Sequence, residues 1–434
     1  MTTRYDAIII GAGIIGSCTA FEMAKKGWKT LNIDKLPAAG YGSTSFSCAI
    51  IRTHYSTLDG TALAYENYFH WLDWPGYLGT DDELGHAKFR NSGCLVMKTP
   101  KNNGLKHMIE HMKVLDIPWQ DWGPEDILKK MPFVDLNNFA PPKLPDEPTF
   151  GEPTGGSIEG GIYFPSAGYM NDPQLCTHNV QRAAESHGAT FRFRSEVSSI
   201  RRDKGRVCGV TLSDGSDINA PVVVNVAGPH SAKINEMAGV AESMNLTTRA
   251  LREEVAYIPG PQGFDVEKNG VITSDSDIGS YSRPEIGNRI LVGSENPECD
   301  PEEWVDPDDY STDPTDQMRY QVMRLAQRMP TLGIPEHPTG VVSLYDVTPD
   351  WIPIYDKSDL GGFYMAIGSS GNQFKNAPVA GKMMLRLIEA CENGQDHDKE
   401  PVVYTLERLN RPLDIGFFSR NRKINDESSF SVLG

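Results

Sequence analysis

The sequence feature that most constrains the fold is a glycine pattern close to the N-terminus. Gly11, Gly13 and Gly16 follow a short apolar strand pattern at 5–10 and precede a helical pattern at 14–26. The first glycine permits a tight turn, the second lets a pyrophosphate approach the backbone, and the third lets the helix lie close to the strand. This order of strand, turn and helix predicts a βαβ unit that binds a dinucleotide.

The second strand of this unit, expected at 29–34, ends in Asp34. A carboxylate at this place accepts hydrogen bonds from ribose hydroxyls. The N-terminus of the helix offers free N–H groups and a partial positive charge to the phosphates. The residues predicted to hold the nucleotide here are Gly11, Ala12, Gly13, Ile14, Ile15, Gly16, Asp34 and Lys35. The pattern alone does not separate FAD from NAD.

Composition excludes several functional classes. The 434 residues carry a net charge of −17, which argues against a nucleic-acid partner. No stretch approaches the roughly 18 apolar residues of a membrane-spanning helix. Asp6 and the glycines disfavour a secretory signal, although the N-terminus loosely imitates one. The seven cysteines are widely spaced and include no Cys-x-x-Cys pair, which predicts reduced thiols in a cytoplasmic protein and neither disulfides nor a metal site.

The pattern along the chain predicts two interleaved domains. Strand and helix patterns alternate at both ends of the chain and near 162–240, whereas 98–160 mixes short helices with loops and 250–335 alternates strands with acidic loops. We expect an α/β fold: a Rossmann-like nucleotide-binding domain with an interleaved α+β substrate domain that carries a mixed or antiparallel sheet. The predicted boundaries are 1–90, 165–240 and 338–434 for the first domain, and 91–164 and 241–337 for the second.

Two later segments favour FAD over NAD. A buried strand pattern at 222–226 ends in Ala227-Gly228, and another at 363–367 ends in a glycine-rich turn at 368–371, before a helix expected at about 377–391. An NAD enzyme must release its cofactor, so one βαβ platform usually serves. A chain that returns twice to the same sheet builds a longer groove, which suits the larger FAD.

Four motifs carry a resemblance to a known family. They are the glycine pattern at 11–16, G-S-T-S at 42–45 with I-I-R-T-H-Y at 50–55, V-V-V-N-V-A-G-P-H-S at 222–231, and Y-D-V-T-P-D at 345–350 with G-S-S-G-N-Q-F-K at 368–375. In these motifs the chain resembles the D-amino-acid oxidase-like superfamily of FAD-dependent oxidoreductases, and within it sarcosine oxidase and related N-methyl amino acid oxidoreductases. The resemblance implies further FAD contacts at Gly42, Ser43, Thr44, Ser45, Ala49, Ile50, Val197, Ala227, Gly228, Gly371, Asn372, Gln373 and Lys375.

The same resemblance implies two catalytic residues, and a third is a candidate by its position. It places Arg52 and Lys375 at a substrate carboxylate, and a guanidinium fork suits a carboxylate. His54 lies two residues after Arg52, where an imidazole tunes the pKa of an amine or simply packs in the interior. Tyr281 and Tyr345 are expected to line the pocket, as packing more than as chemistry.

Departures from the family pattern qualify these expectations. Ser343 stands where monomeric sarcosine oxidases carry a flavin-linked cysteine, so the FAD is expected to be non-covalent. Ala49 replaces an arginine, and Leu291 stands near the position of a lysine thought to activate oxygen, which favours a dehydrogenase over an oxidase. The histidine that binds FMN in heterotetrameric relatives is missing beside Asn171-Asp172, so no FMN is expected.

These observations predict an FAD-dependent oxidoreductase for a small secondary or N-methylated amino acid. The substrate transfers a hydride to flavin N5, the imine hydrolyses, and the electrons pass to oxygen or to another acceptor. Two alternatives stay open: an enzyme for another small amino or hydroxy acid, and an FAD-bound subunit of a multi-subunit dehydrogenase with a partner subunit.

Overall fold

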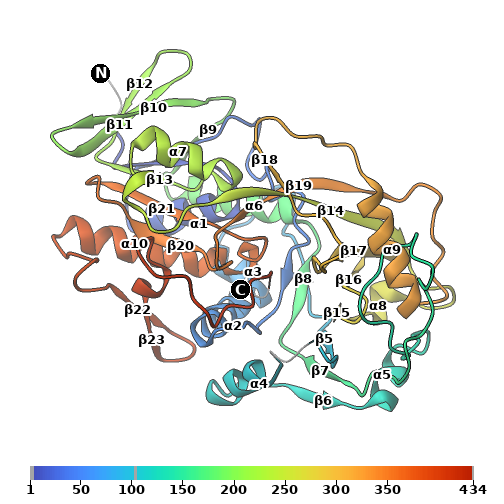
Figure 1. Ribbon diagram of the computed structural model, residues 1–434. Coiled ribbons are helices and arrows are strands. Elements are labelled where there is room, and N and C mark those ends of the chain that lie inside the picture. Colours follow the sequence, from blue (N-terminus) through green and yellow to red (C-terminus); the bar gives the residue numbers. More distant parts are fainter. Residues whose placement is uncertain (1–3, 102–104, 433–434) are drawn as a thin grey trace.

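A computed structural model describes residues 4–101 and 105–432 and contains two main sheets (Figure 1). The first sheet has six strands in the order β20-β21-β13-β1-β2-β9. All neighbouring pairs are parallel except β20 with β21. Its strands are β1 (Ala7–Ile10), β2 (Thr30–Ile33), β9 (Thr190–Arg192), β13 (Val222–Asn225), β20 (Ile354–Lys357) and β21 (Phe363–Ile367). The expected βαβ unit and the two later strands of the nucleotide domain are therefore confirmed.

Both faces of this sheet are covered, because successive side chains of a strand point to opposite faces. Ala7 and Ile9 of β1 belong to one core cluster, and Ile8 and Ile10 belong to another. Helix α1 (Ile14–Lys25) packs against α6 (Pro173–Ser186) and α10 (Ala377–Glu392) in the first cluster. A small sheet of β10 (Val197–Asp203), β11 (Arg206–Leu212) and β12 (Asp217–Asn219) contributes to the second cluster with α7 (Ser231–Ala238). A parallel sheet buried in this way suits its β-branched strands.

The second sheet has nine strands in the order β18-β14-β17-β16-β15-β5-β7-β6, with β19 paired to β14. It is mixed, as expected, because β15 pairs with β5 in parallel while its other pairs are antiparallel. The strands are β5 (Cys94–Met97), β6 (Gln120–Trp122), β7 (Gly161–Phe164), β14 (Arg249–Pro259), β15 (Ile272–Asp275), β16 (Ser280–Glu285), β17 (Arg289–Ser294), β18 (Glu303–Val305) and β19 (Thr339–Val347).

Helix α9 (Asp316–Arg328) covers this sheet and was not expected from the sequence. Its apolar side chains, Met318, Val322 and Leu325, are buried in the same core cluster as strands β14 and β17. Their spacing of four and three residues is the helical signal, which the acidic loop before the helix obscured. Thr315 caps the helix by accepting a hydrogen bond from the Gln317 N–H, 3.2 Å away.

The proposed domain boundaries stay a prediction. The strands of the six-stranded sheet lie in the segments 7–33, 190–225 and 354–367, and those of the nine-stranded sheet lie in 94–164 and 249–347. Strand β19 starts at Thr339, inside the segment assigned to the nucleotide domain, yet it pairs with β14 of the other sheet. Both β14 and β19 contact η1 (Gly228–His230), so these long strands join the two parts of the molecule (Figure 1).

The remaining helices and short strands lie outside the two main sheets. Helices α2 and α3 follow each other directly and are separated by Asp73, which ends α2 and caps α3 by accepting the Gly76 N–H. Among the described residues no helix combines the length and apolar composition needed to cross a membrane. The elements are α2 (Leu58–Leu72), α3 (Trp74–Leu78), α4 (Leu105–Val114), α5 (Pro124–Lys130), α8 (Val266–Asn269), β3 (Ile50–Ile51), β4 (Phe89–Arg90), β8 (Gly168–Met170), β22 (Val403–Leu406), β23 (Arg411–Asp414), η2 (Ala241–Ser243), η3 (Phe374–Asn376) and η4 (Ile415–Phe418).

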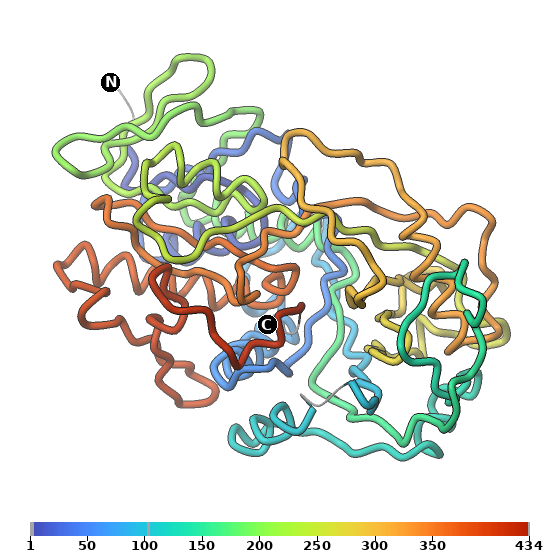
Figure 2. Tube along the Cα trace, viewed as in Figure 1, coloured from blue at the N-terminus to red at the C-terminus, as the bar shows by residue number. Residues whose placement is uncertain are grey.

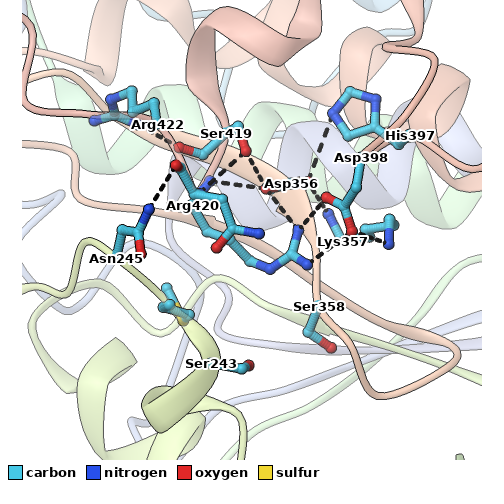
Figure 3. A network of polar contacts seen from close by, with 12 residues as sticks. Ser243, Asn245, Asp356, Lys357, Ser358, His397, Asp398, Ser419, Arg420 and Arg422 are labelled. Atoms are coloured by element: carbon cyan, nitrogen blue, oxygen red, sulfur yellow. Dashed lines mark hydrogen bonds and ion pairs between the residues drawn. The ribbon is translucent and has the colours of Figure 1, made fainter.

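The C-terminal segment 419–432 returns to the middle of the molecule, between the two sheets (Figure 2). A network of buried ion pairs fastens its beginning (Figure 3). Arg420 donates to Asp356 at 3.0 Å and to Asp398 at 2.9 Å, and Arg422 donates to Asp350 at 2.7 Å. Buried charges of this kind hold a segment in one place because breaking a pair leaves an uncompensated charge.

Candidate functional site

A single cavity of about 1340 Å³ runs from the glycine turn before α1 to Lys375. Its walls come from the turn itself, the loop at 41–56, strands β14 and β19, the turn at 368–375 and the C-terminal segment. Segments from both sheets and from both ends of the chain therefore meet around one space. A cavity at the carboxyl ends of parallel strands is the usual ligand site of such folds.

The glycine turn at one end of the cavity tolerates no side chain. Gly11 has φ +116°, and a Cβ on it would lie 2.3 Å from the Val226 carbonyl oxygen. A Cβ on Gly16 would lie 2.3 Å from the Gly11 carbonyl oxygen. Asn32 fixes the turn from β2, since its Nδ2 donates to the carbonyls of Gly11 and Gly16 at 3.3 and 3.2 Å. Gly11 and Gly16 therefore offer only backbone atoms to a ligand in the cavity.

The N-terminus of α1 faces the cavity. Gly13 is its N-cap and supplies no side-chain cap, while the Ile14 N–H donates to Thr44 Oγ1 at 3.3 Å. Asp34 accepts the Ala12 N–H at 2.8 Å and the Leu36 N–H at 2.9 Å. Each carboxylate oxygen keeps a further lone pair, so both can also accept a ribose hydroxyl.

Most residues predicted for the cofactor line the cavity, and two do not. Ala12 is buried behind the turn, and Ser45 donates its hydroxyl to the Gly42 carbonyl at 2.9 Å. Lys35 lines the cavity but is engaged with Asp308 at 2.7 Å. The residues that line it are Gly11, Gly13, Ile14, Ile15, Gly16, Asp34, Lys35, Gly42, Ser43, Thr44, Ala49, Ile50, Val197, Ala227, Gly228, Gly371, Asn372, Gln373 and Lys375.

Arg52 lies at the opposite end of the cavity and is 7% exposed. Its guanidinium donates to the carbonyls of His54 and Val432 and stacks over the Tyr55 ring at 4.2 Å. Burial lowers the pKa of this arginine from its usual value. No carboxylate pairs with it among the described residues, so its charge is balanced only by neutral carbonyls and a ring.

Lys375 lies beside Arg52 and is 4% exposed. Its Nζ donates to the Asn372 carbonyl at 2.7 Å and to Tyr55 Oη at 3.2 Å, so the two cations share Tyr55. Burial, and then the charge of Arg52, hold the pKa of Lys375 well below its usual value. Neither of these buried basic groups has a carboxylate partner among the described residues, so an incoming carboxylate would stabilise their charged forms.

His54 also lines this end of the cavity. Its ring is stacked on Phe164 at 4.2 Å, and neither ring nitrogen has a hydrogen-bond partner among the described residues. Burial, followed by the charges of Arg52 and Lys375, holds its pKa well below the ordinary value, so the imidazole is neutral. The geometry therefore brings all three predicted catalytic residues together, while the choice between packing and chemistry for His54 stays open.

Tyr281 and Tyr345 line the wall between the two ends, as expected. Tyr281 Oη lies 3.1 Å from Cys48 Sγ, and Ser343 lines the cavity two residues before Tyr345. Leu291 is buried in the β14–β17 pair and does not line the cavity. Its position therefore says nothing about an oxygen-activating group.

Two carboxyl groups in the cavity wall were missed by the sequence reasoning. Glu253 lies on β14, and Glu295 directly follows β17. Burial raises the pKa of each to about 7. Neither has a cationic partner among the described residues. For Glu253 the available signal was an acidic residue within an apolar strand pattern, but this does not reveal which face of the sheet the side chain is on, and Glu295 lies beyond such a pattern.

One group of side chains away from the cavity has a geometry that could hold a metal ion. The ligand atoms of Asp82, Glu83 and His178 lie within 4.8 Å of one another. Asp82 already accepts a hydrogen bond from Asn179 at 2.8 Å, and Arg182 pairs with Glu83 at 3.4 Å. Arg182 thus balances one of the two carboxylate charges, and the Asn179 amide gives the other a neutral hydrogen bond.

A family model named DAO and described as FAD dependent oxidoreductase matches residues 6–387. The chain belongs to this family. It is similar in sequence to sarcosine oxidase subunit beta of Rhodobacter capsulatus, with 25% identity over 392 residues that span 89% of this chain and 85% of the relative. It is also similar to glycine oxidase of Geobacillus kaustophilus, with 24% identity over 91% of this chain and 96% of that protein.

Solved structures show the same fold in this family. The crystal structure of L-proline dehydrogenase from P. horikoshii matches with a TM-score of 0.75 and 20% identity over 97% of this chain and 98% of that one. Glycine oxidase from Geobacillus kaustophilus matches with a TM-score of 0.74 and 19% identity over 98% and 100% of the two chains. The predicted family, fold class, oxidoreductase activity and FAD cofactor are thereby confirmed for the DAO-family protein described here.

Proposed function

We propose that this DAO-family protein oxidises the C–N bond of a small, carboxylate-bearing secondary or N-methylated amino acid. The observation that carries the proposal is the pair Arg52 and Lys375, two buried cations without a carboxylate partner among the described residues, at one end of the cavity. The relatives named sarcosine oxidase subunit beta and glycine oxidase support a substrate of this size and charge.

The residues at the other end of the cavity fit the ADP half of FAD. Side chains are excluded at Gly11 and Gly16, the N-terminus of α1 offers its N–H groups, and Asp34 keeps lone pairs for ribose hydroxyls. Ser343 has no thiol with which to bond the flavin, which supports non-covalent binding. FAD supplies the hydride acceptor when it is bound.

The side chains of this chain then bind and orient the substrate. Arg52 and Lys375 fix the carboxylate, which leaves the carbon beside the nitrogen as the part of the molecule free to face the cofactor. Tyr281 and Tyr345 form an aromatic wall that keeps water away from this carbon. His54, held neutral, offers a hydrogen bond to the amine without placing a third positive charge beside it.

The electron acceptor and the assembly are further parts of the proposal. The electrons pass to oxygen or to another acceptor, because Leu291, which is buried away from the cavity, does not decide between an oxidase and a dehydrogenase. The relative named sarcosine oxidase subunit beta favours, as a second candidate, an FAD-bound subunit that acts with a partner subunit. The described free cysteines support a reducing, cytoplasmic compartment.

The test is anaerobic mixing of the purified protein with sarcosine, dimethylglycine, proline and glycine, followed by readmission of air. We expect a yellow protein whose flavin absorbance is lost with one of the N-substituted substrates, and the rate at which it returns in air separates a dehydrogenase from an oxidase. Acid precipitation should release the FAD into the supernatant. A colourless protein that binds no FAD, or a flavin that none of these compounds reduces, would contradict the proposal, and rapid recovery in air would identify an oxidase.

A further inference from the structure

Glu295 carries a carboxyl group in the cavity wall and has no role in the reaction proposed above. It accepts the Ser274 hydroxyl at 2.5 Å and the Asp275 N–H at 3.1 Å, both from β15. These two neutral donors hold its side chain in one orientation. No lysine, arginine or histidine pairs with it in the described parts of the chain.

Glu295 and the two basic groups share one neighbour, Cys94, which is 2% exposed and lies at the start of β5. Cys94 is paired with Ile272 of β15, two residues before Ser274, and with Phe164 of β7, on whose ring His54 stacks. Cys94, Glu295 and the two basic groups all line the same cavity. The cavity therefore holds a basic pair and a separate carboxyl group on the two sides of Cys94, and none of the three has an ion-pair partner in the parts of the chain that the structure describes.

A small zwitterion would satisfy this arrangement. A buried carboxylate without a partner is costly, and it is stabilised either by a proton or by a cation that enters beside it. In the same way, the cationic pair is stabilised by an entering carboxylate. An amino acid carries both groups a few bonds apart, whereas a hydroxy acid supplies only the carboxylate.

We propose that Glu295 binds the ammonium group of the substrate while Arg52 and Lys375 bind its carboxylate. The proposal rests on the proposed function and narrows it, because it selects amino acids and excludes hydroxy acids. Glu295 then makes the protein prefer a ligand with an ammonium group over a ligand of the same shape with an uncharged group at that position.

Two matched ligands separate this contact from general binding. 2-Aminoisobutyrate carries an ammonium group and has no hydrogen on the carbon beside the nitrogen, so FAD cannot oxidise it there. Pivalate has the same carboxylate and shape, with a methyl group in place of the ammonium. Calorimetric titration of the FAD-loaded protein with each ligand gives the ratio of the two affinities.

Glu295→Gln removes the charge and keeps an oxygen that accepts the hydrogen bonds from Ser274 and Asp275. We expect wild type to prefer 2-aminoisobutyrate by about 10- to 100-fold, the range of a hydrogen bond to a charged group, and E295Q to bring the ratio within about threefold of unity. FAD absorbance and melting temperature establish that the variant is folded and loaded.

Glu253→Gln is the matched contrast. Glu253 lies in the same cavity with a similarly raised pKa, but it accepts a hydrogen bond from Asn296 at 2.9 Å, and its charge acts on Tyr281 and Tyr345. We expect E253Q to keep the preference for 2-aminoisobutyrate. If E253Q loses the preference as E295Q does, or if E295Q keeps it, the assignment of Glu295 is wrong. If wild type binds neither ligand, the carboxylate site and the proposed function fail as well.

The pH dependence of the ratio provides a second readout. Burial, and the charge of Asp275 next to it, raise the pKa of Glu295 to about 7, although Asp275 is itself paired with Arg328 of α9 at 2.7 Å. The thiol of Cys94, neutral because burial raises its pKa to about 12, is its neighbour in the cavity, and Arg52 and Lys375 line the same cavity. Glu295 gains its charge as the pH rises through 7, so the preference for the ammonium ligand should increase from pH 6 to pH 8. A ratio that stays flat in wild type would contradict the proposal.

Discussion

The two ends of the cavity offer different chemical groups to a ligand. At the glycine end the groups required are the backbone N–H donors of one continuous βαβ unit and the absence of side chains at Gly11 and Gly16. At the substrate end the lining consists of side chains from separate segments: Arg52 and His54, Cys94, Glu295 and Lys375. At the first end Lys35 and Lys233 are paired with Asp308, whereas among the described residues Arg52, Lys375 and Glu295 have no ion-pair partner.

The two kinds of site differ in what they cost the stability of the folded protein. A site of backbone groups costs little stability, since the glycine turn and the helix terminus belong to the fold anyway. A site of unpaired buried charges is costly, and its groups are stabilised only when a ligand of complementary charge is bound. Substitutions at the two ends should therefore have separable effects, one on the cofactor and the other on the substrate.

The largest effect is expected from Gly11→Ala. The new Cβ would lie 2.3 Å from the Val226 carbonyl, at a residue with φ +116°. Strain of about 3 kcal/mol corresponds to a loss of FAD affinity of about 100-fold or more. The measurement is the flavin-to-protein absorbance ratio after purification. Gly333→Ala is the control, because no atom lies within 4 Å of a Cβ placed there. Full FAD content in G11A would contradict the role of the turn.

The contrast between the two ends also explains what could be predicted from the sequence. The glycine turn and Asp34 are encoded locally, within one strand–helix–strand unit, so their arrangement follows from spacing alone. Arg52 and Lys375 were predicted only through the family resemblance, because no local pattern places residues 323 positions apart beside the same tyrosine. Glu295 gave no signal, since its importance comes from the neighbours that strand pairing supplies.

A second prediction concerns the cationic pair. Lys375→Met keeps an unbranched side chain of similar length and removes the charge. The variant should bind FAD normally, while the KM for the amino acid rises about 30-fold or more, as expected when one member of a buried charge contact is lost. The comparison of FAD content with KM separates the two ends of the cavity. Loss of FAD and of substrate binding together would show that the ends are not independent.

A third prediction concerns Asp346, a residue of β19 that lines the cavity. Its carboxylate accepts the Gly368 N–H at 2.6 Å, next to the turn at 368–371. Burial raises its pKa to about 7. A raised carboxyl pKa means that its contribution to stability is complete below the unfolded pKa and is lost as the pH rises to 7.

Asp346→Asn removes this titration. Relative to wild type, the melting temperature of D346N should therefore rise between pH 5 and pH 8, by an amount on the order of 2–4 °C. The comparison uses the change with pH and not the absolute value, since the amide also alters the hydrogen bond to Gly368. A difference between the two proteins that is constant with pH would show that Asp346 does not titrate in this range.

The smallest effect is expected from the C-terminal segment, which touches the substrate end. The Val432 carbonyl accepts a hydrogen bond from Arg52, and the Ser429 N–H donates to Ser56 Oγ at 3.2 Å. Because a substrate carboxylate must compete with this carbonyl for the guanidinium, a chain that ends at Ser429 should bind the substrate about threefold more tightly. Val432→Ala keeps the carbonyl and removes the side chain that packs near Tyr345, so it separates the two effects. Tighter substrate binding in the shortened chain but not in V432A would show that the Val432 carbonyl is what competes with the substrate for Arg52. The charged end of the cavity would then depend, like the glycine end, on a backbone group.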